Sequence, residues 1–336
     1  MTTIDVVSGL LRPGGLRAGK PQSAGSLTVV PVFHDGPPLV YVTLAEGVAA
    51  GTVRVEEVSE GGSVGSLRVV NRGSVPVLLV EGEVLAGLKQ TRTLTTTVLV
   101  AANTVTVIPV ACVEQGRWSY RSTAAAPDDY FVSPGVRHPK SRSVQATVRA
   151  RGDYAADQGA VWSSVEERLV RHRAPAPTRS YDEVGHHRGA EIEAGIAALR
   201  PEPGQQGVLA LIGRHPVACD LFDRPETLRA LWRALVGSYY ADALVEGRPA
   251  EERHVKEALD RLHTLAEGRA TVHPAVGLGE VVQVSAGGAV ASALVADGAV
   301  VHLAALWPEQ QDRPEPRVRM QRPSGRQRWF HEESSR

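Results

Sequence analysis

The sequence predicts an α+β fold with a β-rich N-terminal half, and with helices and further strands packed in the C-terminal half. Two observations support this class. Between residues 27 and 118, short runs of β-branched residues are separated by Gly, Asn and Pro, a pattern typical of strands and turns. From residue 141 onward, hydrophobic residues recur at helical spacing, and apolar strand-like runs follow.

The N-terminal half is expected to contain short strands and one short helix. The expected strands are Leu27–Val32, Leu39–Thr43, Val53–Val58, Leu67–Asn71, Val77–Val80, Val84–Leu88, Thr93–Val100 and Val105–Val113, and the expected helix is Leu44–Ala50. Residues 124–142 contain three prolines, so they are expected to be irregular.

The C-terminal half is expected to mix helices with strands. Helices are expected over 141–151, 157–173, 181–199 and 251–266, and strands over 208–212, 217–221, 289–296 and 299–305. A further helix is expected to begin at Asp223, which has capping-box spacing to Glu226, and Trp232 lies on its apolar face. Asp297-Gly298 is a typical two-residue hairpin turn.

Composition indicates a globular protein with no strong field of either sign. Of 336 residues, 43% are hydrophobic and 22% are charged, and 37 basic residues balance 37 acidic ones. The two cysteines, Cys112 and Cys219, lie in apolar strings and are interpreted as reduced, buried thiols. With no signal-peptide pattern and no apolar run of membrane-spanning length, we expect a cytoplasmic protein without membrane contact.

We expect a single α+β domain over residues 27–306, because no long linker divides it. Residues 1–26 are rich in Gly, Ser and Arg and are expected to form a flexible arm. Residues 307–336 are expected to be a basic, disordered tail with six arginines between 313 and 328. Such a tail is either solubilising or makes weak contacts with nucleic acid or acidic protein.

Three polar strings interrupt the apolar sequence, and the first is Val80–Arg92 (VEGEVLAGLKQTR). Glu81 and Glu83 are two residues apart, so on a strand they would share a face, and their repulsion would raise one pKa or require a cation. Lys89 and Arg92 follow closely in the sequence and can supply this cation, and Gln90 between them adds an amide. This set suits acid–base chemistry, ribose hydroxyls or phosphate; alternatively it is a hairpin with exposed charges.

The second and third strings are 112–118 (CVEQGRW) and 157–162 (DQGAVW). In the second, the Trp118 ring could stack a base and the forked guanidinium of Arg117 could bind phosphate. Alternatively, the strand simply ends in a solvated turn. In the third, Asp157 is expected to be the N-cap of a helix, with Gln158 beside it. Alternatively, the free backbone N–H groups at this helix start bind an anion. No string has metal-ligand spacing, so no metal site is predicted, and the sequence identifies no cofactor.

Together these strings resemble the "ARG and Rhodanese-Phosphatase-superfamily-Associated Protein" domain, in which ARG stands for ADP-ribosylglycohydrolase. The matching segments are 80–92, 109–118, 157–162, 220–227 (DLFDRPET), 238–239 (SY) and 293–302 (ALVADGAVVH). The resemblance extends from about Leu27 to Leu306. One departure is Thr91, where the family usually has Asn. The family's name implies a bacterial setting of ADP-ribose or NAD-derived metabolism, conflict or repair.

Two hypotheses follow from the resemblance. In the first, the protein binds or processes an ADP-ribosyl, NAD-derived or nucleotide ligand, with Glu81, Glu83 and Glu114 handling protons or ribose hydroxyls. Lys89, Arg92 and Arg117 would then hold the diphosphate, and Trp118 would stack the base. In the second, the protein is a non-catalytic adaptor. The first hypothesis expects one pocket. Its expected members are Glu81, Glu83, Lys89, Arg92, Glu114, Gln115 and Trp118, with Gln90, Arg117, Asp157 and Gln158 as further ligand-binding candidates.

Overall fold

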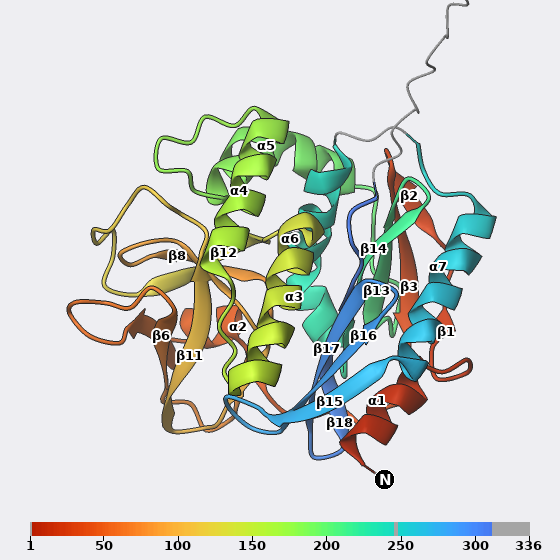
Figure 1. The fold of residues 1–336 in the computed structure, drawn as a ribbon, viewed down its shortest axis with the longest axis horizontal. Coiled ribbons are helices and arrows are strands. Elements are labelled where there is room, and N and C mark those ends of the chain that lie inside the picture. The colour runs from red at the N-terminus through yellow and green to blue at the C-terminus, as the bar shows by residue number, and fades with distance from the viewer. Residues whose placement is uncertain (1, 245–247, 311–336) are drawn as a thin grey trace, which may run out of the picture.

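The computed structural model describes residues 2–244 and 248–310, so the predicted tail beyond residue 310 lies outside the described residues. The fold is α+β, as predicted. A small barrel forms most of the N-terminal half, and a large antiparallel sheet with helices on both faces includes most of the C-terminal strands (Figure 1).

The barrel is closed by six strands in the order β11-β6-β5-β12-β8-β9. Its strands are β5 (Val53–Glu57), β6 (Ser66–Asn71), β8 (Glu83–Gly87), β9 (Arg92–Leu94), β11 (Thr104–Cys112) and β12 (Ala125–Phe131). Alternate residues fill its interior with Val and Leu side chains, as the period of two in a strand requires. Beside it lie a three-stranded sheet of β4 (Val42–Thr43), β7 (Val77–Leu79) and β10 (Val98–Val100), and the helix α2 (Leu44–Ala49).

The large sheet has nine strands in the order β1-β3-β13-β14-β18-β17-β16-β15, with β2 paired to β3. Its strands are β1 (Arg17–Ala18), β2 (Gln22–Ala24), β3 (Leu27–Phe33), β13 (Gly207–Ile212), β14 (His215–Phe222), β15 (Arg269–Pro274), β16 (Glu280–Ala286), β17 (Ala289–Ala296) and β18 (Ala299–Leu306). The predicted hairpin between β17 and β18 is confirmed: Asp297 and Gly298 have φ angles of 46° and 78°, the left-handed backbone that Asp-Gly favours.

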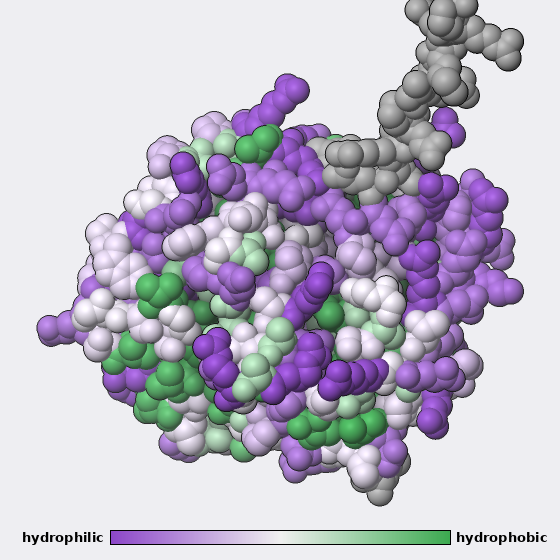
Figure 2. All heavy atoms as spheres, viewed as in Figure 1, coloured by the Kyte–Doolittle hydropathy of each residue, from purple (hydrophilic) through white to green (hydrophobic). Residues whose placement is uncertain are grey.

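Helices cover both faces of this sheet. On one face, α3 (Pro134–Arg151) and α6 (Pro225–Ala243) pack between the sheet and the barrel, and Trp232 is buried there as predicted. On the other face lie α1 (Thr3–Leu11), α7 (Glu252–Thr264) and the short η1 (Leu265–Glu267). The outer side of α7 is hydrophilic, which fits a helix that buries a single face (Figure 2). The helices α4 (Gln158–His172) and α5 (Asp182–Ile196) pack against the barrel.

Residues 2–26 do not form the flexible arm that the sequence predicted. Thr2 and Asp5 form a capping box that starts α1, and Val7 and Leu11 of this helix are buried against the large sheet. The prediction of a flexible arm rested on the Gly, Ser and Arg content of the segment and overlooked Val7 and Leu11, two apolar residues at helical spacing. At the other end, Trp307 is also buried, so the folded part continues past residue 306.

Two further expectations were wrong. Residues 124–142, expected to be irregular, form β12 and the first half of α3, where Pro134 occupies the first turn, a position that tolerates proline. Asp223 does not cap α6; the N-cap is Arg224, and the Asp223 carboxylate accepts hydrogen bonds from the Leu39 amide and the Tyr41 hydroxyl. A tertiary contact therefore replaced the local one.

The helices of the described residues are all too short or too polar to cross a lipid bilayer.

Candidate functional site

Polar side chains gather inside one end of the barrel, which we call the barrel mouth: Glu57, Gln90, Arg92 and Cys112. The alternation that turns Val53 and Val55 inward also turns Glu57 inward at the end of β5. Arg92 begins β9 and is paired with Cys112 at the end of β11. The ends of three strands therefore place a carboxylate, a guanidinium and a thiol in the interior at the same end of the barrel.

Arg92 is the unusual member of this group. Its side chain is fully buried, yet its Nε and Nη1 have no hydrogen-bond partner among the described residues. Its Nη2 donates to the Ser63 carbonyl over 3.3 Å. Burial lowers the pKa of this guanidinium, although the nearby Cys112 and Glu57 oppose that shift. A buried charge with unused donors is rare in proteins, and such groups concentrate where a ligand or water completes them.

The loop between β5 and β6, residues 58–65, covers the mouth. Lys89 Nζ donates to the carbonyls of Glu60 and Gly61 over 2.6 and 2.9 Å. The same ammonium lies 5.7 Å from the centre of the Trp118 ring, and the Arg92 guanidinium lies 5.3 Å from it. Two cations and an aromatic ring thus lie together beneath the loop. The backbone carbonyls of the loop accept hydrogen bonds from these two cations.

Cys112 is buried as the sequence predicted, and its Sγ donates to Gln90 Oε1 over 2.9 Å. Burial raises the pKa of this thiol to about 11, so at neutral pH it is protonated. A protonated thiol bonded to an amide oxygen is a packing group rather than a nucleophile. Gln90 is thereby fixed at the mouth.

Glu114 and Arg117 lie next to the mouth but bind each other. The Glu114 carboxylate accepts from Arg117 Nε and Nη2 over 2.9 and 2.6 Å and from the Thr91 amide over 2.9 Å. These bonds hold the pKa of Glu114 below its usual value, although burial alone would raise it. Arg117 also donates to the carbonyls of Leu88 and Ser119. This pair ties the strap 114–121 to the β8–β9 turn.

The remaining candidates of the second and third strings make structural contacts. Gln115 is exposed and its side chain accepts from Arg179. Asp157 caps α4 by accepting from the Ala160 amide over 3.1 Å. The Gln158 side chain accepts from the Cys112 amide and donates to the Cys112 carbonyl, at 2.9 and 2.8 Å, so it fixes the end of β11 that carries the thiol.

Glu81 lies elsewhere, because residues 80–83 form a turn with Gly82 at a φ of 92°, so Glu81 and Glu83 do not share the strand face that was expected for them. Its carboxylate binds Arg137 and Lys140 of α3, both fully buried. The two cations hold the pKa of Glu81 below its usual value against the opposing effect of burial. Glu81 therefore joins the barrel to α3.

Arg137 continues this network into the large sheet. It donates to both oxygens of Asp220 on β14, over 2.9 and 2.6 Å. Asp220 also accepts from the Tyr239 hydroxyl and lies 3.1 Å from His302 Nε2, and His302 Nδ1 lies 2.7 Å from Thr97 Oγ1. We call these residues the interlayer network: Thr97, Glu81, Arg137, Lys140, Asp220, Tyr239 and His302. Sequence reasoning missed it, although Asp220 and His302 each interrupt an otherwise apolar strand.

Glu83 is buried, and the one hydrogen bond recorded for its side chain is from the Val80 amide, over 2.5 Å. Among the described residues, no cation opposes the effect of burial on the pKa of this carboxyl. Burial raises its pKa to about 8, so the carboxyl is protonated at neutral pH.

We therefore expect the free energy of unfolding to depend on pH through Glu83. The pKa of Glu83 is higher in the folded state than in the unfolded state. At pH values between these two pKa values the folded state binds more protons than the unfolded state, so the stability falls as the pH rises through this range. Glu83→Gln mimics the protonated form and removes this loss. Between pH 6 and 8 the wild type should lose about 2 kcal/mol relative to the variant, at about 1.4 kcal/mol per pH unit. Urea unfolding at the two pH values measures it, and a constant difference would contradict the assignment.

The structure does not bring the seven expected pocket residues together. Lys89, Arg92 and Trp118 meet at the mouth, and Glu114 lies beside them. Glu81 and Glu83 lie at the far end of β8 and β9, since Arg92 pairs with Leu85 and Gly82 bonds to Leu94. Glu83 is the first residue of β8, whereas the basic residues follow the last residue of that strand, and the turn at Gly82 takes Glu81 away from β8 altogether.

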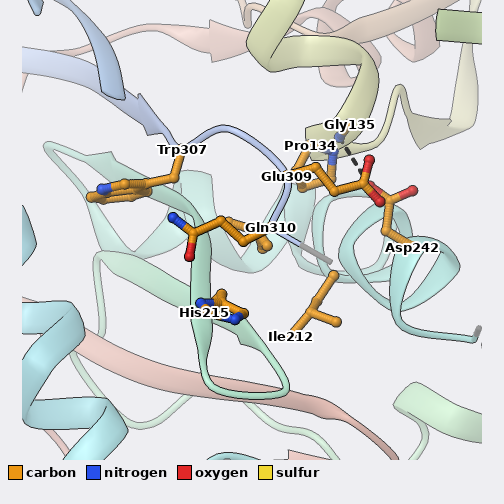
Figure 3. A pocket seen from close by; sticks show the side chains of 9 residues that line it. Pro134, Gly135, Ile212, His215, Asp242, Trp307, Glu309 and Gln310 are labelled. Atoms are coloured by element: carbon orange, nitrogen blue, oxygen red, sulfur yellow. Dashed lines mark hydrogen bonds between the residues drawn. The ribbon is translucent and has the colours of Figure 1, made fainter. Parts of the chain in front are cut away.

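A separate hollow lies where α3 begins (Figure 3). It is lined by Pro134, Gly135, Ile212, His215, Val217, Asp242, Trp307, Glu309 and Gln310. Asp242 accepts from the Gly135 amide over 2.9 Å, and Glu309 binds Arg168 of α4. Its free volume is about 30 Å³, which suits one or two water molecules and not a nucleotide.

Among residues 2–244 and 248–310, no group of three or more His, Cys, Asp or Glu side chains is arranged to hold a metal ion. Lys89 and Arg92 are instead cationic donors suited to an organic anion, and Glu57 has an acceptor oxygen suited to a hydroxyl group.

Of three comparisons with known proteins, the one with protein-family models gives a match. No curated protein matches the sequence. No solved structure matches it. The model of the ARG and Rhodanese-Phosphatase-superfamily-associated Protein domain matches residues 15–306, which is most of the chain and includes both the barrel mouth and the interlayer network. The chain therefore belongs to the family of the ARG and Rhodanese-Phosphatase-superfamily-associated Protein domain.

Proposed function

We propose that the protein binds an ADP-ribosyl, NAD-derived or nucleotide ligand through a phosphate group at the barrel mouth. One observation carries the proposal: the Arg92 guanidinium is fully buried and two of its nitrogens have no partner among the described residues. Leaving donors of a buried charge unpaired costs several kcal/mol. A phosphate accepts from a guanidinium with two parallel hydrogen bonds, so it offsets this cost.

Neighbouring groups favour the same ligand class. Lys89 adds a second cation, and Trp118 adds an aromatic ring close to both cations. Glu57 Oε2 is buried and has no partner in the described part of the chain, so it can accept a hydrogen bond from a hydroxyl. Free donors beside a free acceptor match a ligand that carries anionic oxygens and hydroxyl groups together, as a ribose phosphate does.

Entry of this ligand requires the 58–65 loop to move. Lys89 and Arg92 are bonded to its carbonyls at Glu60, Gly61 and Ser63. A phosphate competes for the same two cations, and charge-assisted bonds to phosphate are stronger than bonds to neutral carbonyls. Ligand binding and loop opening are therefore coupled.

The proposal is one of binding. Glu81 and Glu114, expected as catalytic carboxylates, are each paired with buried or half-buried cations. Glu57 is the carboxylate closest to the proposed phosphate that keeps an unused oxygen. A role in bacterial conflict or repair, which the family name implies, is part of the same proposal.

A thermal-shift screen tests it. ADP-ribose, NAD and AMP are expected to raise Tm, because a ligand that binds only the native state stabilises it by about 2.7 kcal/mol at 100 times its Kd. Adenosine, which lacks the phosphate, serves as the matched control and should give a much smaller shift. Equal shifts with adenosine, or none with any phosphorylated compound, would count against the proposal.

A non-catalytic adaptor is the second candidate. It is favoured by Val105 and Val107, whose side chains are 61% and 54% exposed on one face of β11. Neighbouring exposed apolar residues on a strand suit a protein contact. The screen distinguishes the two candidates, because an adaptor has no reason to bind a phosphorylated nucleoside.

A further inference from the structure

An open cleft lies beside the barrel mouth. It is lined by Arg54, Glu56, Glu57, Val58, Ser59, Glu60, Arg68, Tyr120 and Thr123. Its volume is about 460 Å³, within the roughly 300–1,000 Å³ typical of small-molecule clefts. It is thus far larger than the hollow at the start of α3.

Glu57 belongs to both the cleft and the mouth. Its Oε1 accepts from the Lys89 amide over 3.2 Å, whereas Oε2 is buried and unpartnered within the described residues. The loop residue Glu60 also lines the cleft, and its carbonyl accepts from Lys89 Nζ. A ligand that binds Arg92 by its phosphate and extends past Glu57 therefore enters this cleft.

Tyr120 gives the cleft an aromatic wall. Its side chain is 50% exposed, and Lys89 Nζ lies 5.0 Å from the centre of its ring. Trp118 is also exposed, but both Lys89 and Arg92 already lie over its ring. Tyr120 lines the cleft and Trp118 does not, so Tyr120 is the aromatic residue available there, although the sequence had suggested Trp118 as the stacking residue. Every nucleobase has a flat π-face that stacks on such a ring.

We propose that this cleft is a nucleoside subsite, in which Tyr120 stacks the base and Glu57 accepts a ribose hydroxyl while the phosphate binds Arg92. The inference rests on the proposed function and adds to it the groups that hold the nucleoside part of a 5′-phosphorylated ligand. The ion pairs of Arg54 and Arg68 with Glu56 also line the cleft, and within the described residues Oε2 of Glu57 remains free to accept from the sugar.

Titration calorimetry with two probes tests the subsite. AMP and ribose 5-phosphate share the sugar phosphate, and AMP alone carries a base. The wild type is expected to bind AMP at least tenfold more tightly than ribose 5-phosphate. Tyr120→Ala should remove this preference and leave the affinity for ribose 5-phosphate unchanged. Tyr120→Phe, which keeps the ring and removes the weak 3.5 Å bond to the Glu60 carbonyl, should retain it.

The outcomes separate the two claims. If Tyr120→Ala keeps the full preference for AMP, or if the wild type binds both probes equally, the nucleoside subsite is wrong while phosphate binding stands. If neither probe binds the wild type, the proposed function fails and the subsite fails with it. Circular dichroism of the variants confirms that exposed Tyr120 can be replaced without loss of fold.

Discussion

Arg137→Met is expected to destabilise the protein by about 3–5 kcal/mol, because removing one partner of a buried ion pair leaves the other charge uncompensated. Arg137 is fully buried and binds Asp220 and Glu81 at once. In the variant, Asp220 keeps the Tyr239 hydroxyl and His302, but the bidentate cation is lost. Chemical denaturation measures the difference in the free energy of unfolding.

A matched control separates position from charge. Arg233 of α6 is about half exposed and pairs with Asp129 and Glu193 at the surface, so Arg233→Met should cost less than about 1 kcal/mol. The double variant Arg137→Met with Asp220→Asn should recover part of the loss, since it also removes a buried charge. Equal effects at positions 137 and 233 would show that the interlayer network does not join barrel and sheet.

Arg92→Met has the opposite expected profile. Without ligand it should be as stable as the wild type or more stable, because Met fills similar space and removes a buried guanidinium with two unpaired nitrogens. Affinity for AMP or ADP-ribose should fall by about 100-fold, in line with roughly 2–5 kcal/mol for one partner of a buried hydrogen-bonded charge pair. Titration calorimetry of the two proteins measures this loss. Opposite effects on stability and binding are typical of functional residues.

Arg188→Met is the control for loss of a positive charge. Arg188 lies on α5 and pairs with Glu191 at the surface. Neither stability nor ligand affinity should change by more than about 0.5 kcal/mol. A similar loss of affinity in this variant would mean that net charge, and not the geometry of the mouth, governs binding.

The sequence predicted elements where a local pattern decided the structure. The Asp297-Gly298 hairpin, the apolar face around Trp232 and the cap at Asp157 all follow from a few neighbouring residues. It failed where a tertiary contact outweighed a local preference. Asp223 has the spacing of a helix cap but binds Leu39 and Tyr41, which are distant in the chain.

The site was predictable in part for the same reason. Lys89, Arg92 and Trp118 lie on two segments whose strands are neighbours, so their convergence followed from the polar strand ends. Glu57 was missed because it lies in a predicted strand whose sequence does not show which of its charged residues turns inward, and it is closure of the barrel that brings the end of β5 to the mouth. Glu81 was misplaced because one left-handed glycine, Gly82, turns the chain.

The free energy of unfolding of wild type and Arg92→Met, each measured with and without saturating ADP-ribose, tests the central claim most directly. We expect the ligand to stabilise the wild type by at least about 2 kcal/mol and the variant hardly at all, while the variant without ligand is no less stable than the wild type. If the unliganded variant is destabilised by several kcal/mol and both proteins respond equally to ligand, Arg92 is a structural residue and the barrel mouth is not the phosphate site.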